Sequence, residues 1–272
     1  MQEIKHKSFL KWVGGKIRIL NDIKALLPAG DRLIEPFAGS CVVSLNTKFN
    51  KYLLADSNTD LINLYKWIQL DGEKIIRIAK RYFTEDNLTE ENYYRLRDKY
   101  NDTKSTRIHS ILFIYLNRHA FNGMCRYNSK GEYNIPCGRY KTVYFPEEEV
   151  LYFMKWSREN KVVFINDDFR NVINTSKEND VVYADPPYSP LTITSNFSSY
   201  TPKDFTEKDH RDLVALAEKS TVPFLISNHS TDFTKKLYKN AQKTQTLMVQ
   251  RMISANGSKR EKVPEILALY SK

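Results

Sequence analysis

The tetrapeptide Asp185-Pro186-Pro187-Tyr188 brings together groups that could hold and activate a planar amine. The aspartate carboxylate and a backbone carbonyl fixed by proline accept hydrogen bonds, and Tyr188 offers an aromatic face. The lone pair of a nucleobase amine is delocalised into the ring, so two acceptors that grip its hydrogens favour the pyramidal, reactive form. The tyrosine can stack on a base that has left a duplex. A rigid turn with a solvated aspartate is the alternative interpretation of the same four residues.

The apolar run 181–184 that precedes this tetrapeptide predicts how it is positioned. The run is short, β-branched and closed by two prolines, so it indicates a buried strand whose carboxyl end carries the site, as in open α/β sheets. Helical stretches such as 17–27, 61–70 and 213–217 lie between further short runs. This alternation predicts a mostly parallel sheet with helices on both faces. The other predicted strands are 32–34, 52–56, 162–166, 224–228, 244–250 and 265–270.

A pair of glycines, Gly14 and Gly15, lies between lysines near the amino terminus. Such a pair suggests that a ligand approaches the backbone closely, although a plain turn before the next helix is an equal alternative. The stretch is not a phosphate-binding loop of the Walker A type. That motif would need glycine at Leu10 and serine or threonine at Ile17.

A second turn, 35–40, follows the first predicted strand and precedes a helix expected to begin near Val42. Such a turn can present backbone N–H groups and the positive helix end to a ligand's carboxylate or hydroxyls. The next strand ends in Asp56, about twenty residues further on, where nucleotide-binding units place an acid on ribose hydroxyls. The run Asp56-Ser57-Asn58 could equally cap the following helix, and both roles can coexist in neighbouring residues.

The strand pattern disappears between about 58 and 140, which predicts an insertion. We expect a catalytic domain in two parts, 1–57 and 145–272, around an inserted domain at 58–144. Basic residues of the segment 118–141 are interleaved with aromatics, asparagines and glycine turns, and only Glu132 is acidic there. This mixture is typical of a surface that reads and opens a duplex, with a solvated basic loop as the alternative. The basic residues are Arg118, Arg126, Lys130, Arg139 and Lys141.

The composition favours a polyanionic partner. Lysine and arginine number 42 against 32 acidic residues in a chain of 272, a formal charge of +10. No signal peptide or long apolar run is recognisable, so we expect a soluble, cytoplasmic protein without a membrane or an obligate protein partner. Cys41, Cys125 and Cys137 lack metal-ligand spacing, so neither a disulfide nor a structural metal is expected. The serine- and threonine-rich segment 189–200 predicts a mobile lid.

In this order the motifs resemble those of the Dam-type DNA adenine methyltransferases, which methylate adenine in GATC. The resemblance covers residues 9 to about 270, and its most specific parts are DPPY and the long insertion segment. The other matching parts are FLKWVGGK, EPFAGS, LLADSN and the ISNH strand end. The resemblance implies an α/β fold with a seven-stranded, mostly parallel, Rossmann-like methyltransferase sheet and an inserted, mainly helical target-recognition domain. It also implies S-adenosyl-L-methionine as cofactor and double-stranded DNA as partner.

The resemblance also assigns site residues. Asp185, Pro186, Pro187 and Tyr188 would hold the flipped adenine, Phe121 would wedge beside the displaced pair, and Asn122 would contact the orphaned base. The cofactor would be lined by Trp12, Lys16, Glu35, Phe37, Ala38, Gly39, Ser40, Asp56 and Asp185. The remaining DNA contacts would come from Lys11, Arg118, Met124, Arg126, Pro136, Arg139 and Tyr140.

Two positions depart from the pattern of many members. Cys41 stands where a second glycine is common, so we expect altered cofactor packing without loss of binding. Phe121 replaces the tyrosine of some members, which keeps the wedge and removes a hydroxyl. Neither change touches the expected reaction, a direct in-line transfer without a covalent enzyme intermediate, in which the three cysteines take no nucleophilic part.

Other functions fit the same acceptor geometry. A methyltransferase for RNA bases or for glutamine amides in proteins would use a similar site, but Asp185, where amide-methylating enzymes resemble NPPY, and the basic insertion weigh against it. A non-catalytic nucleic-acid-binding protein of the same fold is a further alternative. The intact DPPY motif argues against such decay.

Overall fold

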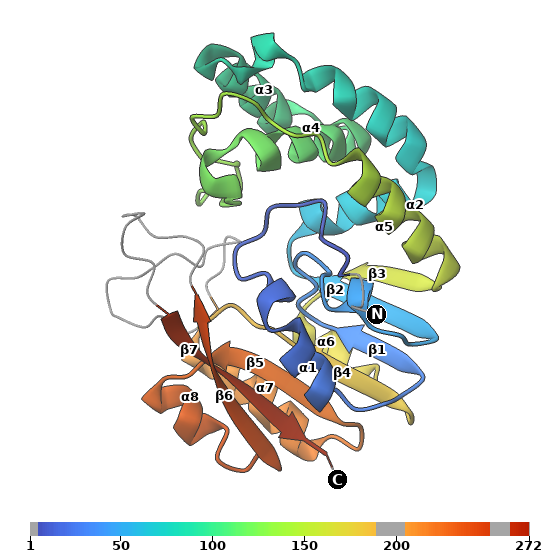
Figure 1. The fold of residues 1–272 in the computed structure, drawn as a ribbon, viewed down its shortest axis with the longest axis vertical. Helices are drawn as coiled ribbons and strands as arrows, with labels where there is room; N and C mark the ends of the chain where they lie inside the picture. Colours follow the sequence, from blue (N-terminus) through green and yellow to red (C-terminus); the bar gives the residue numbers. More distant parts are fainter. Residues whose placement is uncertain (1–4, 189–204, 251–261, 272) are drawn as a thin grey trace.

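A computed structural model describes residues 5–188, 205–250 and 262–271 and contains one seven-stranded sheet (Figure 1). The strands are β1 (Arg32–Glu35), β2 (Lys51–Asp56), β3 (Val162–Asn166), β4 (Asp180–Ala184), β5 (Phe224–His229), β6 (Lys243–Gln250) and β7 (Lys262–Tyr270). Their order is β3-β2-β1-β4-β5-β7-β6; the first five run parallel, and β7 is antiparallel to both neighbours. The predicted α/β fold with a mostly parallel sheet is confirmed.

The strand order reverses at β1, which pairs with β2 on one side and β4 on the other. In open α/β sheets the crevice at the carboxyl ends of such strands is the usual ligand site. Glu35 ends β1, and Asp185 directly follows β4. The sheet therefore brings the second turn and the DPPY motif to the same edge.

Helices cover both faces of the sheet. They are α1 (Leu20–Leu26), α2 (Thr59–Ala79), α3 (Glu90–Asp102), α4 (Thr106–His119), α5 (Glu147–Glu159), α6 (Phe169–Asn174), α7 (Glu207–Lys219) and α8 (Asp232–Leu237). Successive strand residues point to opposite faces. Leu33 packs with residues of α1, α2 and α5 in one buried cluster, whereas Ile34 packs with residues of α6 and α7 in the other. This is why the central strands are apolar at nearly every position.

The helices α3 and α4 form a layer apart from the sheet, and α2 and α5 lead from this layer back to the strands (Figure 1). The predicted helix 61–70 is the first half of α2. Asn58 caps its start by accepting a hydrogen bond from the Leu61 N–H at 3.0 Å, and the backbone breaks helical geometry at Asp71. At the next residue, a side chain on Gly72 would collide with Met154 of α5.

The helix expected from Val42 is wrong. Only a 3-10 turn, η2 (Ser44–Asn46), forms there. Cys41 has a φ of +57°, and the Asn46 side chain donates to the Val42 carbonyl at 2.7 Å. The chain turns back towards β2 within a few residues, so no helical turn can be added. The predicted helix 17–27 is likewise shorter, a 3-10 turn, η1 (Lys16–Arg18), followed by α1.

Four further expectations concern a lid, a membrane span, a structural metal and a disulfide. The predicted lid 189–200 lies outside the described residues. Among the helices that the structure describes, none is both long and apolar enough to cross a membrane. Within the same ranges no three His, Cys, Asp or Glu side chains are grouped to hold a metal, and the three cysteines are free thiols.

Candidate functional site

Asp185 lies at the centre of a polar cluster at the carboxyl end of β4. Its Oδ2 is 2.8 Å from the Nζ of Lys16, and its Oδ1 accepts a hydrogen bond from Ser227 at 2.9 Å. The hydroxyl of Tyr183 lies 3.0 Å from that of Ser227. A carboxylate has about four acceptor positions, so these two partners orient Asp185 and leave capacity for a further donor.

Lys16 is a buried cation, with 4% of its side chain exposed. Its ammonium also donates to the Gly14 carbonyl at 2.7 Å and lies 4.5 Å from the centre of the Tyr188 ring. Gly14 has a φ of +82°, a conformation that favours glycine. The predicted glycine turn thus delivers Lys16 to the DPPY motif, where its charge offsets that of Asp185.

Tyr188 is held by a residue that the sequence interpretation missed. Its hydroxyl donates to Glu265 Oε2 at 3.1 Å, and its ring packs edge-on against His229 at 4.3 Å. Glu265 is 8% exposed, and burial raises its pKa above the ordinary value. A glutamate in the otherwise apolar run Glu265-Ile-Leu-Ala-Leu-Tyr was the available signal, because a buried acid needs a partner.

Buried side chains support the turn 35–40 that follows β1. Glu35 is buried and accepts a hydrogen bond from the Ser44 hydroxyl, and burial raises its pKa to about 8. Gly39 has a φ of +44°, and a side chain there would come within 3.0 Å of the Trp12 indole nitrogen. Trp12 and Gly39 therefore lie against each other, as expected for one wall of a site. Ala38 and Ser40 of the same turn are buried.

Asp56, at the end of β2, connects this turn to α2. Its Oδ2 accepts from the Gly39 N–H at 3.0 Å and its Oδ1 from the Asn58 N–H at 2.9 Å. Desolvation raises its pKa above the ordinary value. Asn58 therefore provides the helix cap, whereas the contact of Asp56 with ribose hydroxyls stays a prediction.

Three phenylalanines form an aromatic cluster at the same edge. The Phe37 ring centre is 5.3 Å from that of Phe169 and 5.5 Å from that of Phe205. Phe37 was predicted, whereas Phe169 at the start of α6 and Phe205 before α7 were not. A phenylalanine after the strand 162–166 was the only signal for Phe169, and Phe205 is brought close by long-range folding alone.

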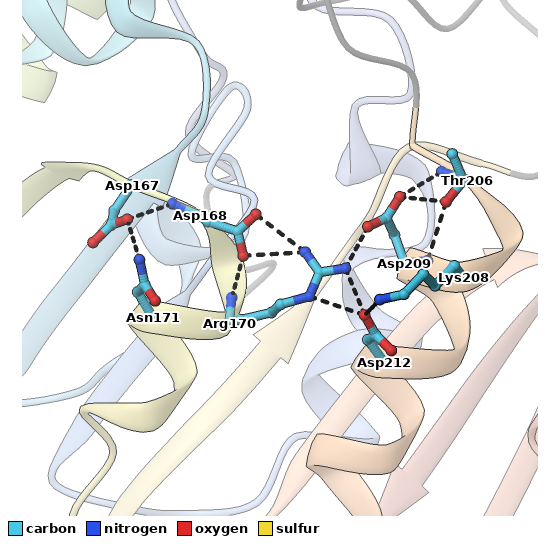
Figure 2. A network of polar contacts seen from close by, with 8 residues as sticks. All are labelled: Asp167, Asp168, Arg170, Asn171, Thr206, Lys208, Asp209 and Asp212. Carbon is cyan, nitrogen blue, oxygen red and sulfur yellow. Dashed lines mark hydrogen bonds and ion pairs between the residues drawn. The ribbon is translucent and has the colours of Figure 1, made fainter.

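Arg170 ties together the two helices that carry these phenylalanines (Figure 2). Its guanidinium contacts Asp168 at 3.1 Å and Asp212 at 2.7 Å, and it also pairs with Asp209. Asp209 further accepts from the hydroxyl of Thr206, at 2.6 Å, in the capping box of α7. The network therefore fixes α6 against α7 beside the aromatic cluster.

We expect Arg170→Met to lower the free energy of unfolding at pH 7 by about 1–2 kcal/mol, since its carboxylate partners are only partly buried. Desolvation opposes the shift, but hydrogen bonds from Thr206 and Arg170 lower the Asp209 pKa to about 2. The ionised Asp209 carboxylate therefore stabilises the folded state fully at pH values well above 3.8, its pKa in the unfolded chain. This stabilisation is lost as the pH falls from 3.8 through about 2, its pKa in the folded state. Urea unfolding between pH 6 and 3 should show the difference between wild type and variant narrowing with acid.

The control is Arg211→Met, which removes an arginine of the same region whose 62% exposed side chain pairs with Glu207 and lies over the Phe233 ring. It should change stability by less than about 0.5 kcal/mol at every pH. A difference for Arg170→Met that stayed constant down to pH 3 would contradict the linkage with Asp209.

The predicted DNA-contacting residues lie mainly on the loops after α4. Phe121 is 50% exposed, although its backbone N–H is tied to the Pro136 carbonyl at 3.0 Å. Asn122 and Gly123 follow with φ values of +54° and +63°, so the chain turns sharply behind the exposed ring. Asn122, Arg126, Pro136 and Arg139 are also exposed, and Met124, Arg118 and Tyr140 are partly buried.

Lys11 joins this surface from the amino-terminal segment. Its ammonium lies 4.3 Å from the Tyr140 ring centre and donates to the Arg118 carbonyl at 3.1 Å. Desolvation and the charge of Arg118 lower the Lys11 pKa. Asn117 clamps the Lys11 backbone from both sides, through the N–H at 2.8 Å and the carbonyl at 2.7 Å. The structure thus brings the first motif and the insertion together.

Comparisons with known proteins agree with this geometry. The model of the D12 class N6 adenine-specific DNA methyltransferases matches residues 12–254. The chain is 43% identical over 270 residues to a DNA adenine methylase of Serratia marcescens, covering 98% of this chain and 99% of that protein. The DNA adenine methylase of Escherichia coli strain K12 is 42% identical over 269 residues, covering 98% and 96%. That of Vibrio cholerae serotype O1 strain ATCC 39541 is 42% identical over 271 residues, covering 98% and 97%.

The match spans nearly the whole length of this chain and of its relatives, and the motifs that carry the sequence resemblance lie inside it. The expected resemblance is confirmed, and the alternatives of amide methylation, RNA methylation and a binding protein without activity lose their support. The chain belongs to the family of D12 class N6 adenine-specific DNA methyltransferases.

Proposed function

We propose that the enzyme transfers a methyl group from S-adenosyl-L-methionine to the exocyclic amine of adenine in GATC, after the adenine has been flipped out of the duplex. The observation that carries the proposal is the arrangement around Asp185. A carboxylate oriented by Lys16 and Ser227 lies next to a tyrosine ring that is itself held in place by Glu265. A flipped base requires hydrogen-bond acceptors for its amine and an aromatic ring on which it can stack.

The protein's part in the reaction is to orient and polarise the amine. Asp185 and the Pro186 carbonyl would accept its two hydrogens, and Tyr188 would stack on the ring. Positive charge develops on the amine as it attacks, and a nearby carboxylate stabilises that charge. The orientation itself removes much of the entropic barrier.

The turn and the aromatic cluster suit the cofactor. Bound S-adenosyl-L-methionine would supply an electrophilic methyl group on a sulfonium. Asp56 is an acceptor suited to ribose hydroxyls, Phe37 lies in a cluster of rings that could pack against an adenine, and Gly39 leaves room beside Trp12. Lys16 reaches Asp185 and would border both ligands. Glu35, closed in by Ser44, is better explained as a brace, so its contact with the cofactor stays a prediction.

The inserted segment 58–144 is proposed as the target-recognition domain. Phe121 would fill the space left by the adenine and Asn122 would face the orphaned base. Lys11, Arg118, Met124, Arg126, Pro136, Arg139 and Tyr140 would contact the recognition sequence or its phosphates. Because DNA is the substrate, we expect the enzyme in the cytoplasm and associated with DNA.

The experiment that tests the proposal is a methylation assay with radiolabelled S-adenosyl-L-methionine on short duplexes that differ at each base of GATC. Label should appear in N6-methyladenine of the GATC duplex and fall strongly for each altered site. Equal labelling of all duplexes would contradict the sequence assignment, and label in cytosine would contradict the chemistry.

Binding to DNA should weaken steeply with salt. The charge of +10 and the exposed arginines imply that several phosphates are neutralised on binding. Log affinity should then fall linearly with log salt, by about 0.9 per phosphate contacted. Fluorescence anisotropy at several salt concentrations measures the slope, and Arg139→Ala should reduce it by about one contact. A slope near zero would be incompatible with this mode of binding.

A further inference from the structure

A carboxylate in the first turn of α2 is shared by side chains from three other elements. Asp60 Oδ2 accepts hydrogen bonds from the hydroxyl of Tyr127 at 2.6 Å and from that of Tyr100 at 2.7 Å. His109 Nδ1 of α4 lies 3.4 Å from Asp60 Oδ1, and its ring stacks on Tyr100 at 3.7 Å. Asp60 therefore links α2, α3 and α4 to the hairpin 124–134.

Both tyrosines remain hydrogen-bond donors. Burial raises the pKa of Tyr100 and of Tyr127 well above the ordinary value, and the neighbouring carboxylate of Asp60 raises it further. Hydrogen bonds from such hydroxyls to a carboxylate are stronger than bonds between neutral groups. The hairpin is thus attached to α2 by a charge-assisted, partly buried hydrogen bond.

Other contacts also hold the hairpin, since Cys125 and Tyr133 are buried in the core cluster. Tyr127 and Tyr133 pair across it, and Asn101 of α3 bonds to the Tyr133 N–H at 2.9 Å and carbonyl at 3.2 Å. A two-stranded hairpin alone is marginally stable in water, so its position depends on anchors such as these. Arg126 is exposed and directly precedes Tyr127, and its Nε donates to Asn134 at 2.9 Å within the hairpin.

We propose that Asp60 is a positioning residue for target recognition: through Tyr127 it fixes the hairpin so that Arg126 is presented to its base at a defined place and angle. This inference rests on the proposed role of Arg126 in reading a guanine. Asp60 itself lies behind the hairpin and would not touch the DNA. It would therefore determine discrimination between sequences and leave the phosphate contacts unchanged.

The physical reason is the strict geometry of a two-point contact. A guanidinium fork matches guanine only when it is held within about half an ångström and 10–20° of the right place. When the hydrogen bond between Tyr127 and Asp60 is removed, the hairpin can shift. Arg126 is then no longer aligned with guanine, and it contacts correct and incorrect bases to a similar extent. The rate on the correct sequence falls, and the rate on a wrong sequence changes little.

The test compares Tyr127→Phe and Asp60→Asn with Arg126→Ala. We would measure single-turnover methylation on a GATC duplex and on a duplex altered at the outer base pair, and take the ratio of the two rates. Tyr127→Phe should lower this ratio by about three- to tenfold, which corresponds to the net contribution of one ordinary hydrogen bond. Asp60→Asn keeps one oxygen acceptor and should lower the ratio less. In the double variant with Arg126→Ala, Tyr127→Phe should cause no further fall.

Matched controls remove the same groups elsewhere on the inserted helices: Tyr94→Phe and Asp98→Asn, two residues of α3 whose side chains contact Arg97. They should leave the ratio unchanged. Thermal unfolding checks that every variant is folded at the assay temperature, and cofactor affinity should match wild type in every variant.

The inference is overturned if folded Tyr127→Phe and Asp60→Asn keep the wild-type ratio while Arg126→Ala lowers it, and the role of Arg126 would then stand alone. If Arg126→Ala itself leaves the ratio unchanged, the proposed reading of the base fails and the positioning role fails with it.

Discussion

Asp185→Ala should lower the single-turnover rate of methyl transfer by several orders of magnitude. The variant removes a charged acceptor, and a hydrogen bond to such a group contributes about 1.5–3 kcal/mol, and more where water is excluded. It also leaves the buried ammonium of Lys16 without its carboxylate partner 2.8 Å away, so the approaching amine meets a cation where it needs an acceptor. Both effects act on the transition state.

Cofactor affinity should change much less, because Asp56 and the turn 35–40 belong to other strands. Asp185→Asn is the sharper form of the experiment, since it keeps the shape and one acceptor oxygen. Asp232→Ala, an exposed acid at the start of α8, is the control for loss of a carboxylate and should behave as wild type. The assignment of Asp185 would be falsified if its variants kept near-normal single-turnover rates with the cofactor bound.

The strands could be predicted because each is a local pattern. The run 181–184 is apolar at every position since both faces of β4 are covered, and its two sets of side chains enter different clusters. The same holds for the first three residues of the predicted strand 224–228, which are apolar and enter both clusters. The strands at the antiparallel edge were less well bounded: β7 begins at Lys262, three residues before the predicted start. Pro264 lies among its first residues, and a proline argues against the interior of a strand.

Site residues could be predicted where they belong to a contiguous sequence motif. They could not be predicted where residues far apart in the sequence come into contact only in the folded chain. DPPY and the acid after β2 are contiguous signals. Glu265 reaches Tyr188 from 77 residues away, and Phe205 meets Phe37 only after the sheet has formed. The family resemblance predicted Lys16 beside the cofactor, but its contact with Asp185 could be known only from the fold.

The helix expected from Val42 failed for a local reason that residue types hide. The left-handed backbone conformation is usually adopted by glycine. Here Cys41 adopts it, with a φ of +57°. Such a residue costs of order 1 kcal/mol or more, which the buried surroundings must offset. The residues after β1 therefore predicted a helix start where the backbone makes a turn.

We expect large effects on methylation from substitutions of two exposed residues, Arg126 and Phe121, which would serve different steps of recognition. Arg126 uses its Nε to hold Asn134, so the two terminal nitrogens are the fork that can match the two acceptors of a guanine. Such a pair is worth about 1–3 kcal/mol against the wrong base. Arg126→Ala should therefore relax discrimination at one guanine by about 5- to 150-fold and reduce methylation of GATC itself.

Phe121 has no hydrogen-bonding group on its side chain, and half of its surface is exposed on a turn made rigid by two left-handed residues. Its work would be to fill the stack when adenine leaves, which offsets an unstacking cost of a few kcal/mol. Phe121→Ala should slow flipping and transfer by ten- to a hundredfold on every duplex, about 1.4–2.7 kcal/mol, with the same preference among sequences.

The two roles are separated by measuring single-turnover rates together with the fluorescence of a base analogue placed at the target adenine. Duplexes carry GATC or a change at one outer base pair. Arg77→Ala and Leu70→Ala, exposed on α2, control for loss of a charge and of an apolar side chain. Arg126→Ala should preserve the fluorescence change that reports base flipping and alter the ratio of the single-turnover rates on the two duplexes. Phe121→Ala should abolish the fluorescence change and leave this ratio of rates unchanged. If Arg126→Ala slowed every duplex by the same factor while Phe121→Ala changed base preference, the two assignments would be reversed, and this model of recognition would have to be abandoned.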